Sequence, residues 1–221
     1  MFKSKRRQIV IPQSEHLGLV GALAMLWGNE DFDLPPVARL SLIAGMGLHD
    51  RGYGHLDNFA IGEMSEVEWQ GIARRSFSMY NSDIVTDTII KYHIRRLASY
   101  YNTQERKAIT LEFSHAIDEQ LQAHNLPKVV FDRLDRITEL TDNISFLFCF
   151  DVPDSGAVSI FPHNHSDTEV SVQYHVADGV IHVAPWPFSV DQFEGYIYAY
   201  HLDGYPARLG PFILTYRLER K

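Results

Sequence analysis

The period of the hydrophobic pattern changes near residue 155, and this change limits the possible folds more than any other feature. Before it, apolar residues recur at the three- and four-residue spacing of helices; after it, they alternate as in strands. The break itself, at 153–156, consists of turn-forming residues. The pattern predicts an α+β fold. We expect a mainly α-helical domain over residues 1–155 and a small C-terminal antiparallel β-sheet over 156–221 that packs on the helices.

The helical part has the spacing of about six helices. Ser14 is placed to cap the first helix, and the proline pair at 35–36 is placed to open the second. The second helix runs to about Leu48 and is apolar nearly all round, so we expect it to be central and buried. Ser65 and Glu68 form a capping box for a third helix. Three more helices are expected over about 83–101, from Thr103 to before Pro127, and over about 129–150.

The C-terminal part predicts strands. Apolar and polar residues alternate over 170–176, Asp178-Gly179 follows, and the chain returns through 180–184. An Asp-Gly pair between two alternating runs is typical of a two-residue hairpin. Alternation recurs over 196–200 and 212–218. One apolar and one polar face is the pattern of an antiparallel sheet with one side in water.

Charge and cysteine content exclude several classes of protein. With 28 acidic and 20 basic residues the formal net charge is −8, which argues against broad binding to nucleic acid or anionic membrane. The single cysteine, Cys149, lies in an apolar run and is expected to be a small buried hydrophobe. The sequence has no signal-peptide pattern and no apolar stretch of the ~20 residues that span a bilayer. We therefore expect a cytoplasmic protein.

The adjacent pair His49-Asp50, at the end of the apolar second helix, is the most informative feature for function. A buried carboxylate beside a buried imidazole is costly unless both are paired or bind a metal ion. Neutral imidazole nitrogen and carboxylate oxygen are good ligands for divalent first-row ions. Further ligands must come from other helices, and His16, His93 and Asp142 are the candidates. The alternative is that these are ordinary hydrogen-bonded histidines and a helix-terminal pair.

A resemblance extends this hypothesis. The segments IPQSEHLGLVGALAMLW, LSLIAGMGLHDRGYG, IIKYHIRRLASYY and LTDNISFLFCFD resemble a bacterial family known mainly as a domain of unknown function. That family is similar to the HD superfamily, whose members are mostly metal-dependent phosphohydrolases. The resemblance implies an HD-type helical core with the metal ligands His16, His49, Asp50 and Asp142. It also implies that His93 helps to bind a second metal or a phosphate.

The expected function follows from this resemblance: hydrolysis of a small phosphorylated molecule with one or two divalent ions (Mn, Fe, Ni, Zn or Mg). His93 or His55 would protonate the leaving group, and Arg51, with Arg95 or Arg96, would offset phosphoryl charge. The turn after the HD pair, RGYGH, lacks the lysine that many phosphohydrolases have soon after it. Two alternatives stay open: an HD-type di-iron oxygenase, and a non-catalytic ligand-binding or sensory protein. The expected partners are a small-molecule substrate and a second copy in a homodimer.

Overall fold

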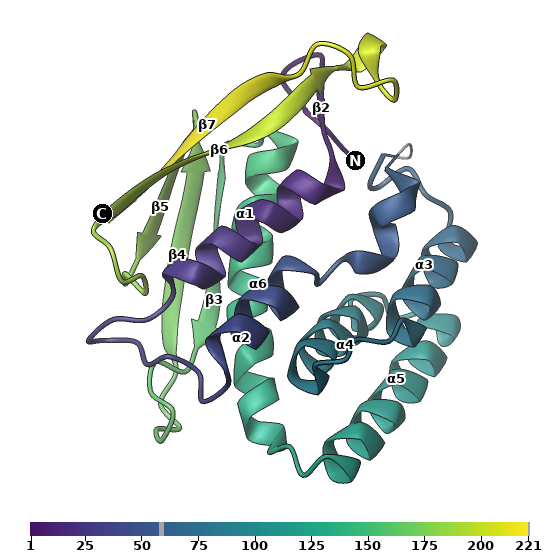
Figure 1. The fold of residues 1–221 in the computed structure, drawn as a ribbon, viewed down its shortest axis with the longest axis vertical. Coiled ribbons are helices and arrows are strands. Elements are labelled where there is room, and N and C mark those ends of the chain that lie inside the picture. The colour runs from purple at the N-terminus through teal and green to yellow at the C-terminus, as the bar shows by residue number, and fades with distance from the viewer. Residues whose placement is uncertain (58–59, 221) are drawn as a thin grey trace.

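The computed structural model describes residues 1–57 and 60–220, apart from the side chains of His55 and Leu56. This part of the chain forms helices first and most of a sheet afterwards, which confirms the α+β prediction (Figure 1). The α-helices are α1 (Gln13–Leu26), α2 (Arg39–Gly47), α3 (Glu66–Ser78), α4 (Ile84–Ser99), α5 (Gln104–Ala123) and α6 (Lys128–Phe150). The strands are β1 (Phe2–Lys3), β2 (Ile9–Ile11), β3 (Asp154–Ile160), β4 (Val170–Ala177), β5 (Val180–Ala184), β6 (Gln192–His201) and β7 (Phe212–Arg220), and the 3-10 helices are η1 (Arg51–Leu56) and η2 (Leu202–Gly204).

The predicted starts of α3, α5 and α6 agree with the structure. Ser65 and Glu68 form the reciprocal capping box at the start of α3. Thr103 caps α5 by accepting a hydrogen bond from the backbone N–H of Arg106. Helix α6 begins directly after Pro127, where a residue without a backbone N–H loses nothing.

The predicted starts of the first two helices were wrong. Helix α1 follows Pro12 without a side-chain cap, so Ser14 lies inside it. Helix α2 begins at Arg39 and not at the prolines, because the N–H of Val37 donates to the carbonyl of Pro35 and closes a tight turn before the helix. Nor is α2 buried all round: the side chain of Leu40 is 81% exposed, so one apolar residue of this helix faces solvent.

The seven strands form one sheet in the order β1-β2-β6-β7-β5-β4-β3. All neighbouring pairs are antiparallel except β5 and β7, which run parallel. Asp178 and Gly179 make the predicted two-residue hairpin, both with positive φ. The N-terminal strands β1 and β2 extend the sheet beyond β6, so the sheet draws residues from both sides of the expected boundary at 155.

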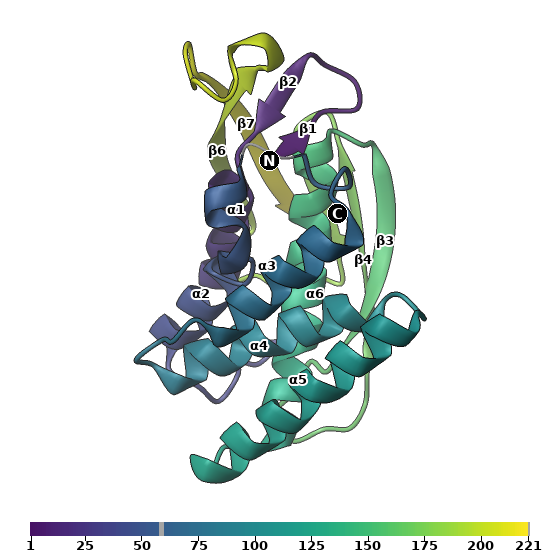
Figure 2. The ribbon, with the colours of Figure 1, turned by 90° about the vertical axis from the view of Figure 1, so that its right-hand side faces the viewer.

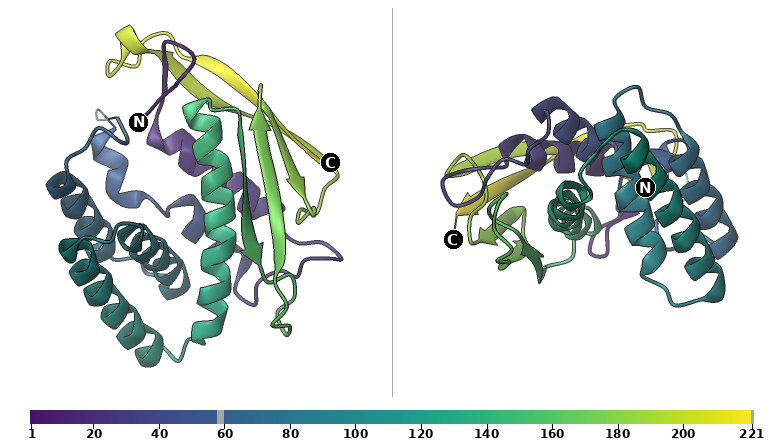
Figure 3. Two further views of the ribbon diagram at one scale, coloured as in Figure 1. Left: turned by 180° about the vertical axis from the view of Figure 1, so that it is seen from behind. Right: turned by 90° about the horizontal axis from the view of Figure 1, so that it is seen from below.

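Helix α6 lies between the sheet and helices α3, α4 and α5, while α1 lies beside α6 and also contacts the sheet at β6 (Figures 1 and 3). It contacts α1 and α4 on one side and β3 and β4 on the other, so a single hydrophobic core reaches from the helices into the sheet. Helices α3 and α5 lie on the far side of α4 from α6 (Figure 2). Within residues 1–57 and 60–220, no helix combines the length and hydropathy needed to cross a bilayer.

Candidate metal centre

Five ionisable side chains from four segments meet where α1, α2, α4 and α6 approach each other. His16 comes from α1, His93 from α4 and Asp142 from α6, while His49 and Asp50 lie between α2 and η1. The three imidazoles are at most 1% exposed, and the two carboxylates 7–8%. Such a group is costly to bury unless its members are paired or bind a cation.

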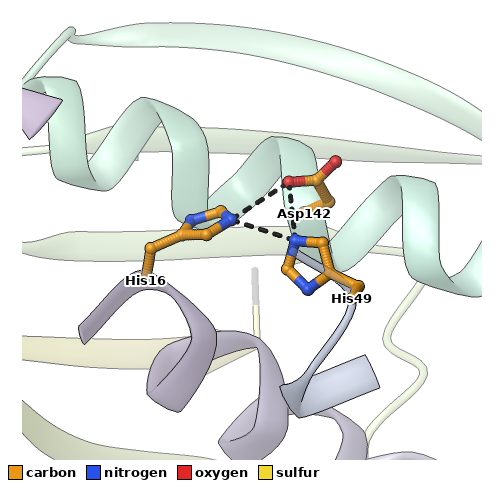
Figure 4. A group of neighbouring side chains, drawn as sticks. All are labelled: His16, His49 and Asp142. Atoms are coloured by element: carbon orange, nitrogen blue, oxygen red, sulfur yellow. Dashed lines mark hydrogen bonds and ion pairs between the residues drawn. The ribbon is translucent and has the colours of Figure 1, made fainter. Parts of the chain in front are cut away.

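Three of these side chains point at one another (Figure 4). The Nε2 atoms of His16 and His49 lie 3.1 Å apart. Oδ1 of Asp142 lies 3.3 Å from the first of them and 3.4 Å from the second. Ligand atoms at about 2.0–2.2 Å from a common ion are about 2.8–3.6 Å from each other, so the three separations suit one shared ion.

The outer nitrogen of each imidazole is fixed by a hydrogen bond. Nδ1 of His49 donates to the carbonyl of Met46 at 2.7 Å. Oγ of Ser145 donates to the carbonyl of His16 and accepts from Nδ1 of His16 at 2.8 Å. Both Nε2 lone pairs therefore face Asp142 and each other, an arrangement that needs a cation between them.

Asp50 supplies a fourth potential ligand atom, a second carboxylate oxygen. Its Oδ2 lies 3.9 Å from Nε2 of His16 and 3.8 Å from Nε2 of His49, slightly beyond the other separations. Nε2 of Gln13 donates to this oxygen at 2.6 Å and so orients the carboxylate. Oε1 of Gln13 is buried and has no hydrogen-bond partner in the described part of the chain. A buried hydrogen-bond acceptor without a partner, beside four potential metal-ligand atoms, suits a water molecule or ligand held at the site.

His93 belongs to the cluster through Asp50. Arg96 donates from Nη2 to Nδ1 of His93 at 2.8 Å, and because an arginine cannot accept, Nδ1 carries no proton. Nε2–H of His93 then donates to Oδ1 of Asp50 at 3.0 Å. Burial and the neighbouring His49 lower the pKa of His93, which keeps its imidazole neutral.

The charges of the cluster favour a cation at its centre. Burial raises the pKa of Asp142, but His16 and His49 outweigh burial and hold that pKa well below its usual value. Burial likewise opposes ionisation of Asp50, and His49 and His93 lower its pKa nonetheless. Burial lowers the pKa of His49, yet Asp50 and Asp142 outweigh it and raise the pKa overall. The two carboxylates thus attract a positive charge, whether a proton on His49 or a metal ion.

Arg96 links the cluster to α6 at a second point. Its Nε donates to Oδ1 of Asp135 at 3.0 Å, its Nη1 donates to the hydroxyl of Tyr100 at 2.7 Å, and its Nη2 lies 3.8 Å from Oδ2 of Asp142. Burial opposes the charge of this guanidinium, but Asp135 and Asp142 raise its pKa, so it stays ionised. Arg96 therefore offsets part of the negative charge of the cluster and fixes the tautomer of His93.

Not all of the expected site residues lie here. The guanidinium of Arg51 is held by Asp87 at 2.9 Å and by the carbonyls of Ser76 and Met79, and Arg51 does not line the cavity beside the cluster. Arg51 thus connects η1 to α3 and α4 through hydrogen bonds. This placement gives no support to a role in offsetting phosphoryl charge. Arg95 packs over the ring of Tyr92. The side chain of His55 lies outside the described residues.

Sequence reasoning missed Gln13 and Ser145. Each lies three residues from a ligand candidate on the same helix, Gln13 before His16 and Ser145 after Asp142. Residues three apart share a helix face, so a search of the ligand-bearing faces for polar residues could have found both.

A cavity of about 500 Å³ lies beside the cluster. Asp50, His93 and Asp142 line it, and its remaining walls include several aromatic side chains. Its volume is in the range of about 300–1,000 Å³ that is usual for small-molecule sites. The buried donor atoms are therefore adjacent to a space that can admit a small organic molecule.

Fold and site together define an α+β protein with a buried His/Asp cluster, between its helices, that can hold a metal ion. Comparisons with protein-family models, with curated proteins and with solved structures found no match for this chain. The family resemblance drawn from the sequence therefore stays a prediction.

Proposed function

We propose that this protein is a metal-dependent hydrolase of the HD type that acts on a small phosphorylated molecule. One observation supports this most strongly: four donor atoms, two imidazole nitrogens and two carboxylate oxygens, converge from three separate segments of the chain. Two of the four proposed ligands, Asp50 and Asp142, line the adjoining cavity of about 500 Å³.

The geometry favours one ion over two. The two groups of potential ligands, His16-His49-Asp142 and His49-Asp50-His93, share His49. Nδ1 of His49 is occupied by Met46, so only its Nε2 is free to bind, and one nitrogen lone pair serves one ion. Nε2 of His93 carries a proton and would have to lose it to become a ligand. We therefore propose a single ion held by His16, His49, Asp50 and Asp142.

The donor set also limits the kind of ion. Mixed imidazole and carboxylate ligands favour Mn²⁺, Fe²⁺, Ni²⁺ or Zn²⁺, whereas Mg²⁺ prefers oxygen alone. A divalent ion balances the charges of Asp50 and Asp142, and Arg96 is already balanced by Asp135 at 3.0 Å. This charge balance supports binding of the ion without a further counter-charge.

When bound, such an ion supplies Lewis-acid polarisation of a phosphoryl oxygen and activation of water for attack. The residues of the chain prepare the site for this chemistry. Gln13 holds the carboxylate of Asp50 in place, and its free Oε1 can accept a hydrogen bond from a water molecule. His93, neutral and donating its Nε2–H to Asp50, helps to hold that carboxylate at the wall of the cavity. Because both of its ring nitrogens are bonded, to Asp50 and to Arg96, His93 suits a role in orientation better than one as a proton donor.

A second candidate, the HD-type di-iron oxygenase, has one observation in its favour. Oδ1 of Asp50 and Nε2 of His93 lie 3.0 Å apart beside the proposed ion, so they could hold a second ion if His93 gives up its proton. Aerobic protein loaded with two equivalents of iron and showing iron-dependent optical bands would support this candidate over the single-ion hydrolase.

The test combines elemental analysis of the purified protein with a screen of phosphomonoester and phosphodiester substrates in the presence of Mn²⁺, Ni²⁺ or Zn²⁺. We expect about one equivalent of metal per chain and metal-dependent turnover. His49→Ala and Asp142→Ala should lose both, whereas His115→Ala, at a side chain 76% exposed on α5, should keep both. Retention of metal and turnover by the two site variants would refute the proposal.

A further inference from the structure

The wall of the cavity beside the His/Asp cluster combines ionisable and aromatic side chains. Asp50, His93 and Asp142 line it, so a molecule inside it can reach the metal ligands. Six aromatic side chains line it as well: Phe2, Tyr53, Trp69, Tyr100, Tyr101 and Phe146. Aromatic walls favour flat, unsaturated ligands, because such rings stack or pack edge-to-face with little loss of contact.

One cation, Arg106, lies among these rings. It is 4% exposed, although it belongs to the otherwise half-exposed helix α5. Its guanidinium carbon lies 3.1 Å from the ring centre of Trp69 and 5.0 Å from that of Tyr101. The planar group is therefore packed against the ring of Trp69, with the ring of Tyr101 nearby.

Arg106 has one unused donor group. Its Nε and Nη2 donate to the two oxygens of Glu66 at 2.6 and 2.9 Å, which is a side-on bidentate pair. Its Nη1 is buried and has no hydrogen-bond partner among the described residues. A buried donor without an acceptor is costly, so it is expected to meet an acceptor from a ligand.

The charges indicate which acceptor fits. Glu66 already balances Arg106, and a divalent ion would balance Asp50 and Asp142. A phosphoryl group would therefore bind at the His/Asp cluster with its metal ion. The Arg106-Glu66 pair is neutral overall, so it does not attract a second anion. An uncharged carbonyl oxygen on a ring is the acceptor that suits Nη1.

We propose that Arg106 is a specificity-determining residue for the proposed hydrolase. It would select phosphorylated molecules that carry a flat ring with a carbonyl-type oxygen, with the ring held against Trp69 and the oxygen bonded to Nη1. This inference rests on the proposed function, because the metal ion anchors the phosphoryl end of the same ligand.

Three phosphonates with uncleavable C–P bonds test it: methylphosphonate, phenylphosphonate and 4-acetylphenylphosphonate. Their dissociation constants are measured by calorimetry with the full chain loaded with Zn²⁺. We expect the phenyl compound to bind about tenfold more tightly than the methyl compound, because its ring is buried. The acetyl compound should gain about another threefold to tenfold from its hydrogen bond to Arg106.

Two variants separate the contribution of the ligand's ring to the affinity from the contribution of its hydrogen bond. Arg106→Lys keeps a cation beside Glu66 but lacks Nη1, so it should lose the acetyl advantage and keep the phenyl advantage. Trp69→Leu should lose the phenyl advantage. Arg74→Lys is the control: Arg74 also pairs with a carboxylate, its Nη1 donating to both oxygens of Glu112, but at the surface and outside the cavity. It should bind all three compounds as the wild type does.

Each outcome decides the question. Equal affinity of the wild type for the phenyl and acetyl compounds, or an acetyl advantage that survives in Arg106→Lys, overturns the inference. The first of these results needs no variant, so it holds even if Arg106→Lys fails to fold. If acetophenone binds the wild type as tightly as its phosphonate and Arg106→Lys abolishes that binding, the role of Arg106 is supported. The same result would remove the support for phosphoryl anchoring and hence for the proposed hydrolase.

Discussion

His16 and His49 present their Nε2 atoms to each other at 3.1 Å, although 33 residues separate them in the chain. Each is turned inward by a bond on its other nitrogen, to Ser145 and to Met46. Two lone pairs that face each other repel unless a cation lies between them. The folding of α1, α2 and α6 against each other thus builds a site whose own stability depends on a positive charge.

The first prediction concerns Gln13, which donates a hydrogen bond to Asp50 and is not one of the four proposed ligands. Gln13→Leu removes the 2.6 Å hydrogen bond to Oδ2 of Asp50 and leaves the four proposed ligands in place. Loss of such a supporting bond typically weakens metal binding by about 10–100-fold. Competition with a chromophoric chelator for Zn²⁺ measures the change. Gln122→Leu, on the exposed face of α5, should bind Zn²⁺ as the wild type does.

A second prediction compares two adjacent arginines. Arg96→Met removes the guanidinium that bonds Asp135, Tyr100 and His93, and it leaves Asp135, 11% exposed, without its closest cation. Breaking a buried ion pair from one side costs about 3–5 kcal/mol of unfolding free energy. Urea denaturation of the two proteins at pH 7 gives this difference.

Arg95 provides the control for that experiment. Its Nη2 is 4.0 Å from Asp135, and its side chain is 21% exposed. Arg95→Met should cost less than about 1 kcal/mol, because its contact with Asp135 is long and Arg96 still pairs with that carboxylate at 3.0 Å. Equal losses in the two variants would show that Arg96 has no special part in supporting the cluster.

Local patterns in the sequence predicted much of this arrangement. Capping residues, turn residues and hydrophobic period are read within a few residues, which is why α3, α5 and the hairpin at Asp178 were anticipated. The pair His49-Asp50 was conspicuous in the sequence because it follows an apolar helix. In the structure, the side chains of His16, His93 and Asp142 lie next to this pair.

The features that were missed depend on contacts between distant segments. β1 and β2 have two and three residues and no readable period of their own; they are strands because β2 pairs with β6, at the other end of the chain. Arg51 looked free beside the HD pair, but Asp87 on α4 binds its guanidinium. Nothing within a few residues of Arg106 indicates that Trp69 and Glu66 enclose it.

A third prediction tests the packing that positions His49. Helix α2 passes so close to α4 at Gly45 that a Cβ there would lie 2.8 Å from side-chain atoms of Ile89. Gly45→Ala should therefore destabilise the protein by about 1–3 kcal/mol despite its better helix propensity. A Cβ added at Gly18 on α1 would meet nothing within 4 Å, so Gly18→Ala should stabilise by about 0.5–1 kcal/mol. Thermal unfolding of both variants decides whether close approach at Gly45 holds α2 in place.

The last prediction concerns pH and the end of α6. Asp151, 8% exposed, accepts hydrogen bonds from Ser4, Arg6 and Arg7, and it has a left-handed backbone with φ of 57°. Burial raises its pKa, but Arg6, Ser4 and Arg7 outweigh burial and lower the pKa overall. A carboxyl whose pKa is lowered by folding contributes stability above its unfolded value of 3.8, and that contribution is lost as the pH falls through the folded pKa.

Asp151→Asn removes this contribution and suits the left-handed backbone, which asparagine tolerates. Because the arginine side chains are 42% and 47% exposed, solvent screens the pairs, and we expect a loss of about 1 kcal/mol at pH 7. The difference from wild type should shrink below about pH 4 and vanish once the wild-type carboxyl is protonated. Asp178→Asn is the control: Asp178 also has a positive φ and pairs with Arg6, but its side chain is 83% exposed, so its substitution should change stability little at any pH. Urea denaturation between pH 3 and 7 measures both differences, and a difference for Asp151→Asn that stays constant down to pH 3 would refute the assigned role of its charge.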